Sequence, residues 1–135
     1  MEKIICIFGD SIAWGAWDIE RGGWAARLRS FFETNNFETN NIEVNVYNCG
    51  VSGDNTDDLL QRFKVEATAR EPYIIIFAIG MNDSQYINSK DHPCVPIEKF
   101  QNNLQELVNQ AKKITNKIIF VGLTKVNESK TMPIP

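Results

Sequence analysis

Three short clusters of small and polar residues carry groups that could act together in acyl transfer. The clusters are Gly9-Asp10-Ser11, Gly50-Val51-Ser52-Gly53 and Gly80-Met81-Asn82-Asp83. The hydroxyl of Ser11 could attack a carbonyl carbon as a nucleophile. The backbone N–H groups of Ser11 and Gly53 and the side-chain NH2 of Asn82 could donate hydrogen bonds to the negative oxygen that forms in that attack.

Each cluster taken alone has an ordinary explanation. A Gly-Asp-Ser tripeptide commonly ends a strand or caps a helix, and a single glycine such as Gly53 commonly occupies a turn. Asn82-Asp83 after a strand commonly forms a cap or an Asx turn. The catalytic interpretation is stronger only if the fold brings the three clusters close together. Whether it does so depends on the elements that precede them.

Apolar runs alternate with segments of helical spacing along the chain. Strands are predicted at residues 3–8, 42–49, 73–79 and 117–123, and helices at 22–33, 56–70 and 97–114. Strands that alternate with helices form βαβ units, so the predicted fold class is α/β with a parallel sheet. The three clusters follow the first three strands, and ligand sites in such sheets lie at the carboxyl ends of the strands. We therefore expect Ser11, Gly53 and Asn82 to converge at one sheet edge.

Four neighbours of these residues are expected to border the substrate. They are Asp10, Trp14, Asp54 and Asp83. Asp54 and Asp83 flank the proposed donors and are also expected to fix their loops, while Asp10 is expected to form hydrogen bonds within its turn. Trp14 and Trp17 have two interpretations, pocket lining and packing. Trp24 is expected in the core because it lies on the apolar face of its helix.

Composition excludes several classes of protein. The 135 residues fit one domain, 1–135, and 14 Lys and Arg against 17 Asp and Glu leave no basic excess for binding nucleic acid. No apolar run approaches the roughly 20 residues of a membrane span. The N-terminal apolar run is too short for a signal peptide, so a cytoplasmic protein with reduced Cys6, Cys49 and Cys94 is expected. The spacing of these cysteines and His92 predicts no metal site.

The three clusters, in this order, resemble the motifs of the GDSL/SGNH hydrolase family. The first motif is Phe8-Gly9-Asp10-Ser11-Ile12 followed by Gly15, and the second runs from Asn48 to Thr56. The third is Gly80-Met81-Asn82-Asp83. The resemblance covers residue 3 to about residue 124 and implies a flavodoxin-like three-layer α/β/α sandwich. It also implies hydrolysis of carboxylic esters or thioesters, as in esterases and lipases, without a metal or cofactor.

The resemblance also implies a role for each motif residue. Ser11 matches the nucleophile of the family, and its backbone N–H matches one oxyanion donor. Gly53 matches the second donor and Asn82 the third. The expected partner is a small-molecule ester.

The chain departs from the family pattern at its C-terminal end. The family has a fifth strand followed by Asp-x-x-His, which supplies the general base and the acid that orients it, and this sequence has no such block. Its single histidine, His92, is preceded at the corresponding position by Ser89. We expect His92 to be an ordinary loop residue; a substitute base is the alternative. The domain is therefore expected to be C-terminally incomplete and inactive or weakly active.

The missing fifth strand affects the expected shape of the sheet. Residues 117–123 would form an exposed apolar edge, which natural proteins usually avoid, and self-association through this edge is a further expectation.

Two other functions stay open at this point. One is a non-catalytic module that keeps the oxyanion pocket and binds a carboxylate or an acyl ligand. The other is a nucleotide-binding domain of flavodoxin type, which is weaker because neither phosphate-binding glycine motif occurs in the sequence.

Overall fold

The computed structural model describes residues 2–35, 42–89 and 91–131, and its centre is a parallel sheet. The strands are β1 (Glu2–Gly9), β2 (Glu43–Gly50), β3 (Ile74–Ala78) and β4 (Ile118–Phe120). They lie in the order β2-β1-β3-β4, and each neighbouring pair is parallel. This arrangement confirms the predicted α/β class with a parallel sheet.

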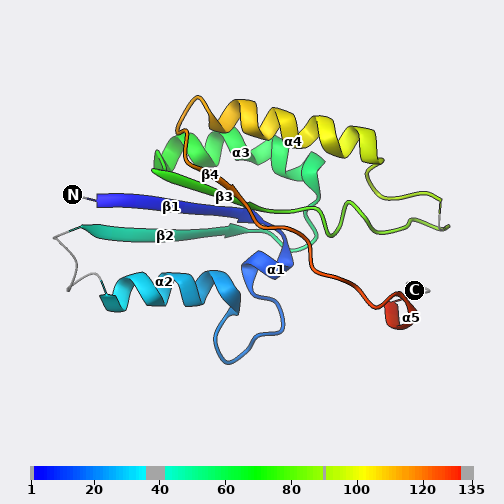
Figure 1. Ribbon diagram of the computed structural model, residues 1–135, viewed down its shortest axis with the longest axis horizontal. Helices are drawn as coiled ribbons and strands as arrows, with labels where there is room; N and C mark the ends of the chain where they lie inside the picture. Colours follow the sequence, from blue (N-terminus) through cyan, green and yellow to red (C-terminus); the bar gives the residue numbers. More distant parts are fainter. Residues whose placement is uncertain (1, 36–41, 90, 132–135) are drawn as a thin grey trace.

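Helices cover both faces of the sheet. The helices are α1 (Ser11–Trp14), α2 (Gly23–Asn35), α3 (Thr56–Arg70), α4 (Ile97–Ala111) and α5 (Glu128–Thr131). Helix α2 lies on one face, and α3 and α4 lie side by side on the other (Figure 1). The fold is therefore the predicted three-layer α/β/α sandwich. No helix in the described part of the chain is long and apolar enough to cross a membrane.

The core has one apolar cluster on each face of the sheet. On the face covered by α3 and α4, Phe63 packs between Phe8 and Phe77, with ring-centroid distances of 4.8 and 5.2 Å. On the other face, Trp24 and other side chains of α2 pack against buried side chains of β1 and β2. The alternation of strand side chains between these two clusters holds β1 in the middle of the molecule, with both faces buried.

Helix α3 begins where the sequence predicts it, because the local signals agree. The Asn55 side chain accepts a hydrogen bond from the Asp58 N–H, and the Asp58 carboxylate accepts one from the Asn55 N–H, which forms a capping box. Acidic residues in the first turn also suit the helix dipole. The carboxyl-terminal part of α4 differs from the prediction, since the helix ends at Ala111 and a turn follows.

Strand β4 is shorter than the predicted 117–123. Its ladder pairs Ile118 to Phe120 with β3, and the last bond of this contact joins the Val121 N–H to the Phe77 carbonyl oxygen at 2.8 Å. Strand β3 ends at Ala78, so the following residues have no strand beside them with which to extend the ladder. The short helices α1 and α5 were also not predicted, because four residues are too few for a periodic signal.

The outer edge of β4 is exposed, as predicted. Ile119, Phe120 and Val121 keep 48%, 46% and 41% of their surface accessible. On the described residues, no strand lies beyond β4. Self-association through this edge stays a prediction, since exposed edge strands pair readily with other chains.

An ion pair joins α3 to α4 and should make stability depend on pH. The Asp57 carboxylate accepts hydrogen bonds from Lys99 Nζ at 2.6 Å and from Asn103 Nδ2 at 2.9 Å. The bond with Lys99 lowers the pKa of Asp57 below its ordinary value. A lowered folded-state pKa stabilises the protein above the unfolded-state pKa, and this contribution is lost as the pH falls through the folded-state pKa.

Lys99→Met is therefore expected to reduce the free energy of unfolding slightly at pH 6 and by less at pH 2. Both side chains are more than a third exposed, at 55% for Lys99 and 35% for Asp57, so the reduction should stay below about 1 kcal/mol. Urea unfolding at the two pH values measures it, with Lys64→Met on the exposed side of α3 as the charge control. Equal losses at both pH values would contradict the assignment.

Candidate active site

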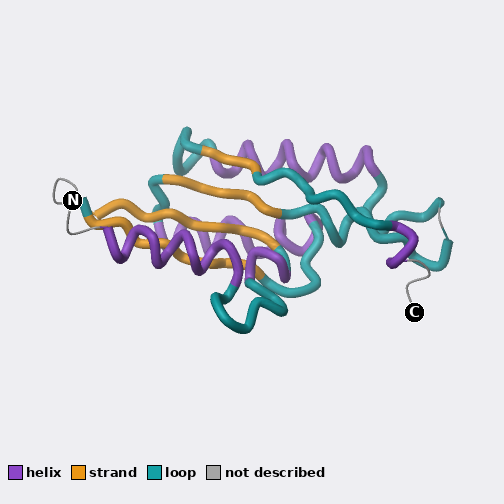
Figure 2. Tube along the Cα trace, turned by 60° about the horizontal axis from the view of Figure 1, so that its bottom comes forward, coloured by secondary structure: helices purple, strands orange, loops and turns teal. Residues whose placement is uncertain are grey.

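The carboxyl ends of three neighbouring strands bring the three clusters together. Gly9 at the end of β1 is in register with Gly50 of β2 on one side and with Ala78 of β3 on the other. The strands end on the same side of the molecule, where the connecting loops gather (Figure 2). The Val51 N–H also bonds to the Gly9 carbonyl oxygen at 3.0 Å, which ties the second cluster to the first.

Ser11 is the first residue of α1, and the surrounding residues hold this helical turn in place. The Asp10 side chain caps α1 by accepting a hydrogen bond from the Ile12 N–H at 2.9 Å. The Asn48 amide donates to the Ala13 carbonyl oxygen at 2.8 Å and accepts from the Gly50 N–H at 3.0 Å. The two Asn48 hydrogen bonds therefore anchor this turn to β2. Ser11 itself is half-buried.

The carboxyl group of Asp10 is buried. Only 2% of the residue is exposed, and desolvation raises the pKa of its carboxyl above the ordinary value, against the opposing effect of backbone N–H groups that favour the charged form. Its carboxylate is directed at the backbone of α1, so it supports the serine turn from within the protein.

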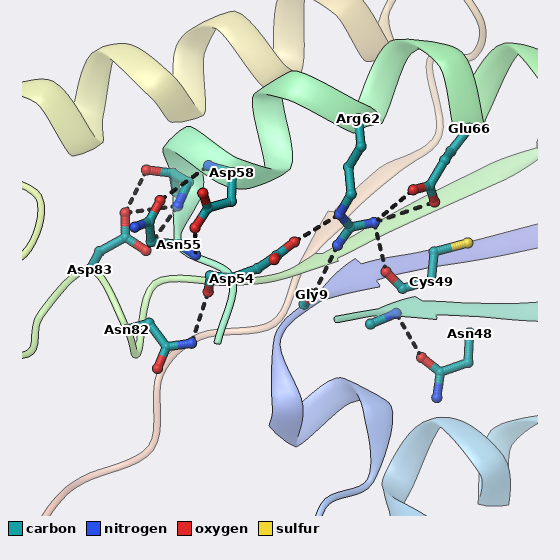
Figure 3. Close-up of polar contacts among 12 residues, drawn as sticks. Gly9, Asn48, Cys49, Asp54, Asn55, Asp58, Arg62, Glu66, Asn82 and Asp83 are labelled. Carbon is teal, nitrogen blue, oxygen red and sulfur yellow. Dashed lines mark hydrogen bonds and ion pairs between the residues drawn. The ribbon is translucent and has the colours of Figure 1, made fainter. Parts of the chain in front are cut away.

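Asn82 lies against the second cluster. Its Nδ2 donates a hydrogen bond to the backbone carbonyl oxygen of Asp54 at 2.8 Å (Figure 3), and its Oδ1 accepts one from Gln85 Nε2 at 3.2 Å. A primary amide carries two N–H hydrogens, so one donor remains beyond the bond to Asp54. Gly53, the residue before Asp54, has a φ of +87° and borders open space on the side where a Cβ would stand.

The other two acidic residues that the sequence places near the substrate, Asp54 just after the second cluster and Asp83 in the third, are engaged by the protein itself. Asp54 forms an ion pair with Arg62, with 2.7 Å between Oδ2 and Nε. Asp83 is 3% exposed and accepts hydrogen bonds from the Thr56 N–H, at 3.0 and 3.1 Å to its two oxygens, and from the Thr56 hydroxyl. These contacts fix the loops that carry Gly53 and Asn82. Direct contact of Asp54 or Asp83 with a substrate stays a prediction.

Two polar residues outside the clusters support the site, and sequence reasoning missed both. Asn103 of α4 donates to the Thr56 hydroxyl at 2.9 Å and extends the buried network to a second helix. Arg62 of α3 reaches the ends of β1 and β2. On a helical wheel both residues look like ordinary solvated side chains, so no sequence signal separates them from the exposed polar face.

The three tryptophans differ in their surroundings. Trp24 packs against the core cluster beneath α2, which confirms the prediction for it. Trp14 is 58% exposed beside the serine turn, and Trp17 is 97% exposed, so the packing interpretation is wrong for Trp17. Whether Trp14 lines a substrate pocket stays a prediction.

Comparison with known proteins places the chain in a family. The model of the GDSL-like lipase/acylhydrolase family matches residues 7–134. The chain belongs to this family. A search among curated proteins found no match.

Solved structures show the fold of this GDSL-like chain in other proteins. AlinE4, an SGNH-hydrolase family esterase, superposes with a TM-score of 0.71 at 24% identity, over 96% of this chain and 63% of AlinE4. A mutant of Axe2, an acetylxylan esterase from Geobacillus stearothermophilus, superposes with a TM-score of 0.74 at 23% identity, over 96% of this chain and 64% of Axe2. The fold is therefore that of the SGNH hydrolases, and the chain spans less than two thirds of the length of these esterases.

His92 is separate from the serine turn in this GDSL-like chain. It is exposed, and its Nδ1 lies 2.6 Å from the Ser89 hydroxyl. The loop that carries it, described at residues 84–89 and 91–96, extends beyond the sheet and away from α1 in both Figure 1 and Figure 2. The arrangement favours the interpretation of His92 as an ordinary loop residue. Within the described residues, no group of three or more His, Cys, Asp or Glu side chains is placed to hold a metal.

Two cavities flank the third cluster of the GDSL-like site. One of about 310 Å³ borders Gly80 and Asp83 and is lined by apolar side chains that include Tyr86 and Phe100. A smaller one of about 110 Å³ borders Asp10, Ile12 and Met81. Since Asn82 lies in the sequence between these lining residues, each cavity adjoins the loop that carries the candidate oxyanion donor.

Proposed function

We propose that this chain carries the nucleophile and the oxyanion donors of a serine ester hydrolase. Ser11 would attack the carbonyl carbon of a carboxylic ester or thioester, and the alkoxide oxygen that forms would accept hydrogen bonds from the Ser11 N–H, the Gly53 N–H and Asn82 Nδ2. A base from outside residues 1–135 would take the proton of the Ser11 hydroxyl and pass it to the leaving group. Collapse of the intermediate would then break the bond to that group, release the alcohol or thiol, and leave an acyl group on Ser11. Water would then hydrolyse the acyl-enzyme.

The observation that carries the proposal is the hydrogen bond from Asn82 Nδ2 to the Asp54 carbonyl oxygen. This bond brings the third cluster against the second, at the end of the strand beside Ser11. The 310 Å³ cavity lies beside this cluster without Ser11, Gly53 or Asn82 in its lining. Its apolar walls would accept a part of the ester away from the reacting carbonyl.

The names of the solved relatives support the same chemistry. Three structures of Axe2 are described as catalytic mutants, in which an aspartate, a histidine or a serine is replaced by alanine. The aspartate and the histidine are three residues apart and carry numbers above 135, whereas the serine lies near the start of its chain. Ser11 would correspond to that serine. The groups that would activate it have no counterpart within this sequence.

We therefore expect residues 1–135 alone to be nearly inactive. An unassisted serine hydroxyl stays protonated and is a poor nucleophile. Serine hydrolases that lose their triad retain only about 10³–10⁴-fold acceleration over water, from the oxyanion hole and binding. The same residues would therefore react faster when a base is supplied from outside.

Labelling with a fluorophosphonate probe tests the proposal. The expected result is slow phosphonylation of the full 135-residue chain, faster with added imidazole, at a site that peptide mapping assigns to Ser11. Ser11→Ala should lose this adduct, and Ser52→Ala, a serine of the second cluster, should keep it. Circular dichroism confirms folding of each variant. An adduct that persists in Ser11→Ala, or no adduct on the folded chain with imidazole, would contradict the nucleophile assignment.

A non-catalytic binding module, which would need no general base, is the second candidate. Such a module would use the same donors to hold a carboxylate or an acyl ligand. Titration with acetate and butyrate, monitored by the NMR resonances of Gly53 and Asn82, tests for such binding. Shifts of these resonances without phosphonylation of Ser11 favour the binding module, and phosphonylation of Ser11 favours the hydrolase. The proposal also includes lipase activity, a small-molecule ester as partner and a cytoplasmic location.

A further inference from the structure

We propose that Arg62 is the positioning residue that holds the three clusters in the geometry needed for the oxyanion site. This inference rests on the proposed function, because it assigns a role within the same site. Arg62 lies on α3, outside all three motifs, and its side chain is 19% exposed.

The Arg62 guanidinium makes contacts in four directions (Figure 3). Its Nη2 donates to the Gly9 carbonyl oxygen at 3.2 Å, and its Nη1 donates to the Cys49 carbonyl oxygen at 3.0 Å. Its Nε donates to Asp54 Oδ2 at 2.7 Å, and its Nη1 also lies 3.3 Å from the Glu66 carboxylate, one turn further along α3. The group thus spans the ends of two strands and the loop after the second.

These contacts reach the first cluster directly, the residues on either side of the second, and the third only through Asp54. Gly9 is two residues before Ser11, so its carbonyl orientation sets the start of the serine turn. Cys49 and Asp54 lie on either side of Gly53. The backbone carbonyl of Asp54 accepts the hydrogen bond from Asn82, so the third cluster is connected to Arg62 through one residue.

Arginine suits this position better than any other cation. Its planar guanidinium has five N–H donors in a fixed fork, so one group can satisfy acceptors in several directions at once. A lysine would keep the charge, but its single nitrogen cannot lie within hydrogen-bond distance of Gly9, Cys49 and Asp54 together. Arg62→Lys therefore removes the geometry and preserves the charge.

A contribution to stability alone is the competing explanation. In that case Arg62→Lys would lower the melting temperature and leave the three oxyanion donors where they are. A positioning role predicts that the donors themselves move. The matched control is Arg29→Lys, since Arg29 bonds to Glu33 at 2.6 Å on the exposed face of α2 and has no part in the site.

The test compares ¹H–¹⁵N spectra and melting temperatures of the full 135-residue chain. In Arg62→Lys, we expect the backbone resonances of Ser11 and Gly53 and the side-chain NH2 resonances of Asn82 to shift. Arg29→Lys should leave them unchanged. If Arg62→Lys does not fold, Asp54→Asn replaces it, because this variant weakens the bond to Arg62 and keeps the backbone carbonyl that Asn82 binds. Donor resonances at their wild-type positions in the folded variant would overturn the inference.

Imidazole-assisted phosphonylation of Ser11 separates this inference from the proposed function. Misplacement of reacting groups by about 1 Å can cost about 100-fold in rate, so a loss of this order is expected for Arg62→Lys at a probe concentration where wild type reacts. A wild-type rate in Arg62→Lys would overturn the positioning role. Shifted donors in Arg62→Lys together with an unreactive wild-type Ser11 would support the positioning role and contradict the proposed function.

Discussion

Asp83→Ala is expected to lower the free energy of unfolding by about 3–5 kcal/mol. The carboxylate is buried and accepts hydrogen bonds from the N–H and the hydroxyl of Thr56 at the start of α3. Each buried donor that loses its acceptor costs about 1–3 kcal/mol, and more where a charged group took part. Thr56 is fully buried, so water cannot replace the lost acceptor without opening the structure. Urea unfolding followed by circular dichroism measures the change.

Two variants make this result specific to the lost hydrogen bonds. Asp83→Asn keeps one acceptor oxygen in nearly the same volume and should lose less than half as much stability as Asp83→Ala. Asp91→Ala removes an exposed carboxylate from the loop before α4 and should change stability by less than about 0.5 kcal/mol. Equal stability of Asp83→Ala and wild type would mean that the Thr56 contacts do not hold the loop.

Gly15→Ala is expected to destabilise the protein by a comparable amount, about 3–5 kcal/mol. Gly15 ends α1 with a φ of +102°, a conformation that costs residues with a Cβ about 1–3 kcal/mol. A Cβ at this position would also overlap the Gly22 carbonyl oxygen, and overpacking against backbone adds about 1–3 kcal/mol. Both costs act on the turn that begins with Ser11. Thermal and urea unfolding of the variant test the sum.

Two other glycines separate the two costs. Gly53 has a φ of +87° and no atom within 4 Å of the place that a Cβ would occupy, so Gly53→Ala should show the conformational cost alone, about 1–3 kcal/mol. Gly122 has neither the positive φ nor a close neighbour, and Gly122→Ala should be neutral within about 0.5 kcal/mol. A Gly15→Ala variant no less stable than Gly53→Ala would show that the chain relaxes around Gly22.

The sequence allowed the layers of the fold to be predicted because its signals were local and consistent. The run at 73–79 is apolar on both faces, and helix 56–70 has its cap, its acidic first turn and its apolar stripe in agreement. The ends of elements that depend on a neighbouring strand were harder to predict. Strand β4 ends at Phe120 because β3 has no further residues with which it could pair. The sequence of residues 117–123 does not indicate where the neighbouring strand ends.

The same distinction applies to the candidate site. The clusters at Ser11, Gly53 and Asn82 were visible because they interrupt apolar strands at positions where parallel sheets collect their loops. The residues that hold them were not visible in the same way. The contact of Arg62 with Gly9 joins residues 53 positions apart, and that of Asn103 with Thr56 joins residues 47 apart, so only the folded chain shows these pairs.

The central place of β1 has a consequence for how the molecule exchanges its amide hydrogens. Strand β1 is paired with β2 over its whole length and with β3 from Ile5 to Gly9, whereas β4 pairs with β3 alone among the described strands, over three residues. Amides of Ile5–Phe8 should therefore exchange with solvent only when the whole molecule unfolds, while those of β4 exchange through local opening. The peptide that leads into Ser11 is thus continuous with the slowest-exchanging strand, and the outer edge of β4 can open and close without disturbing it.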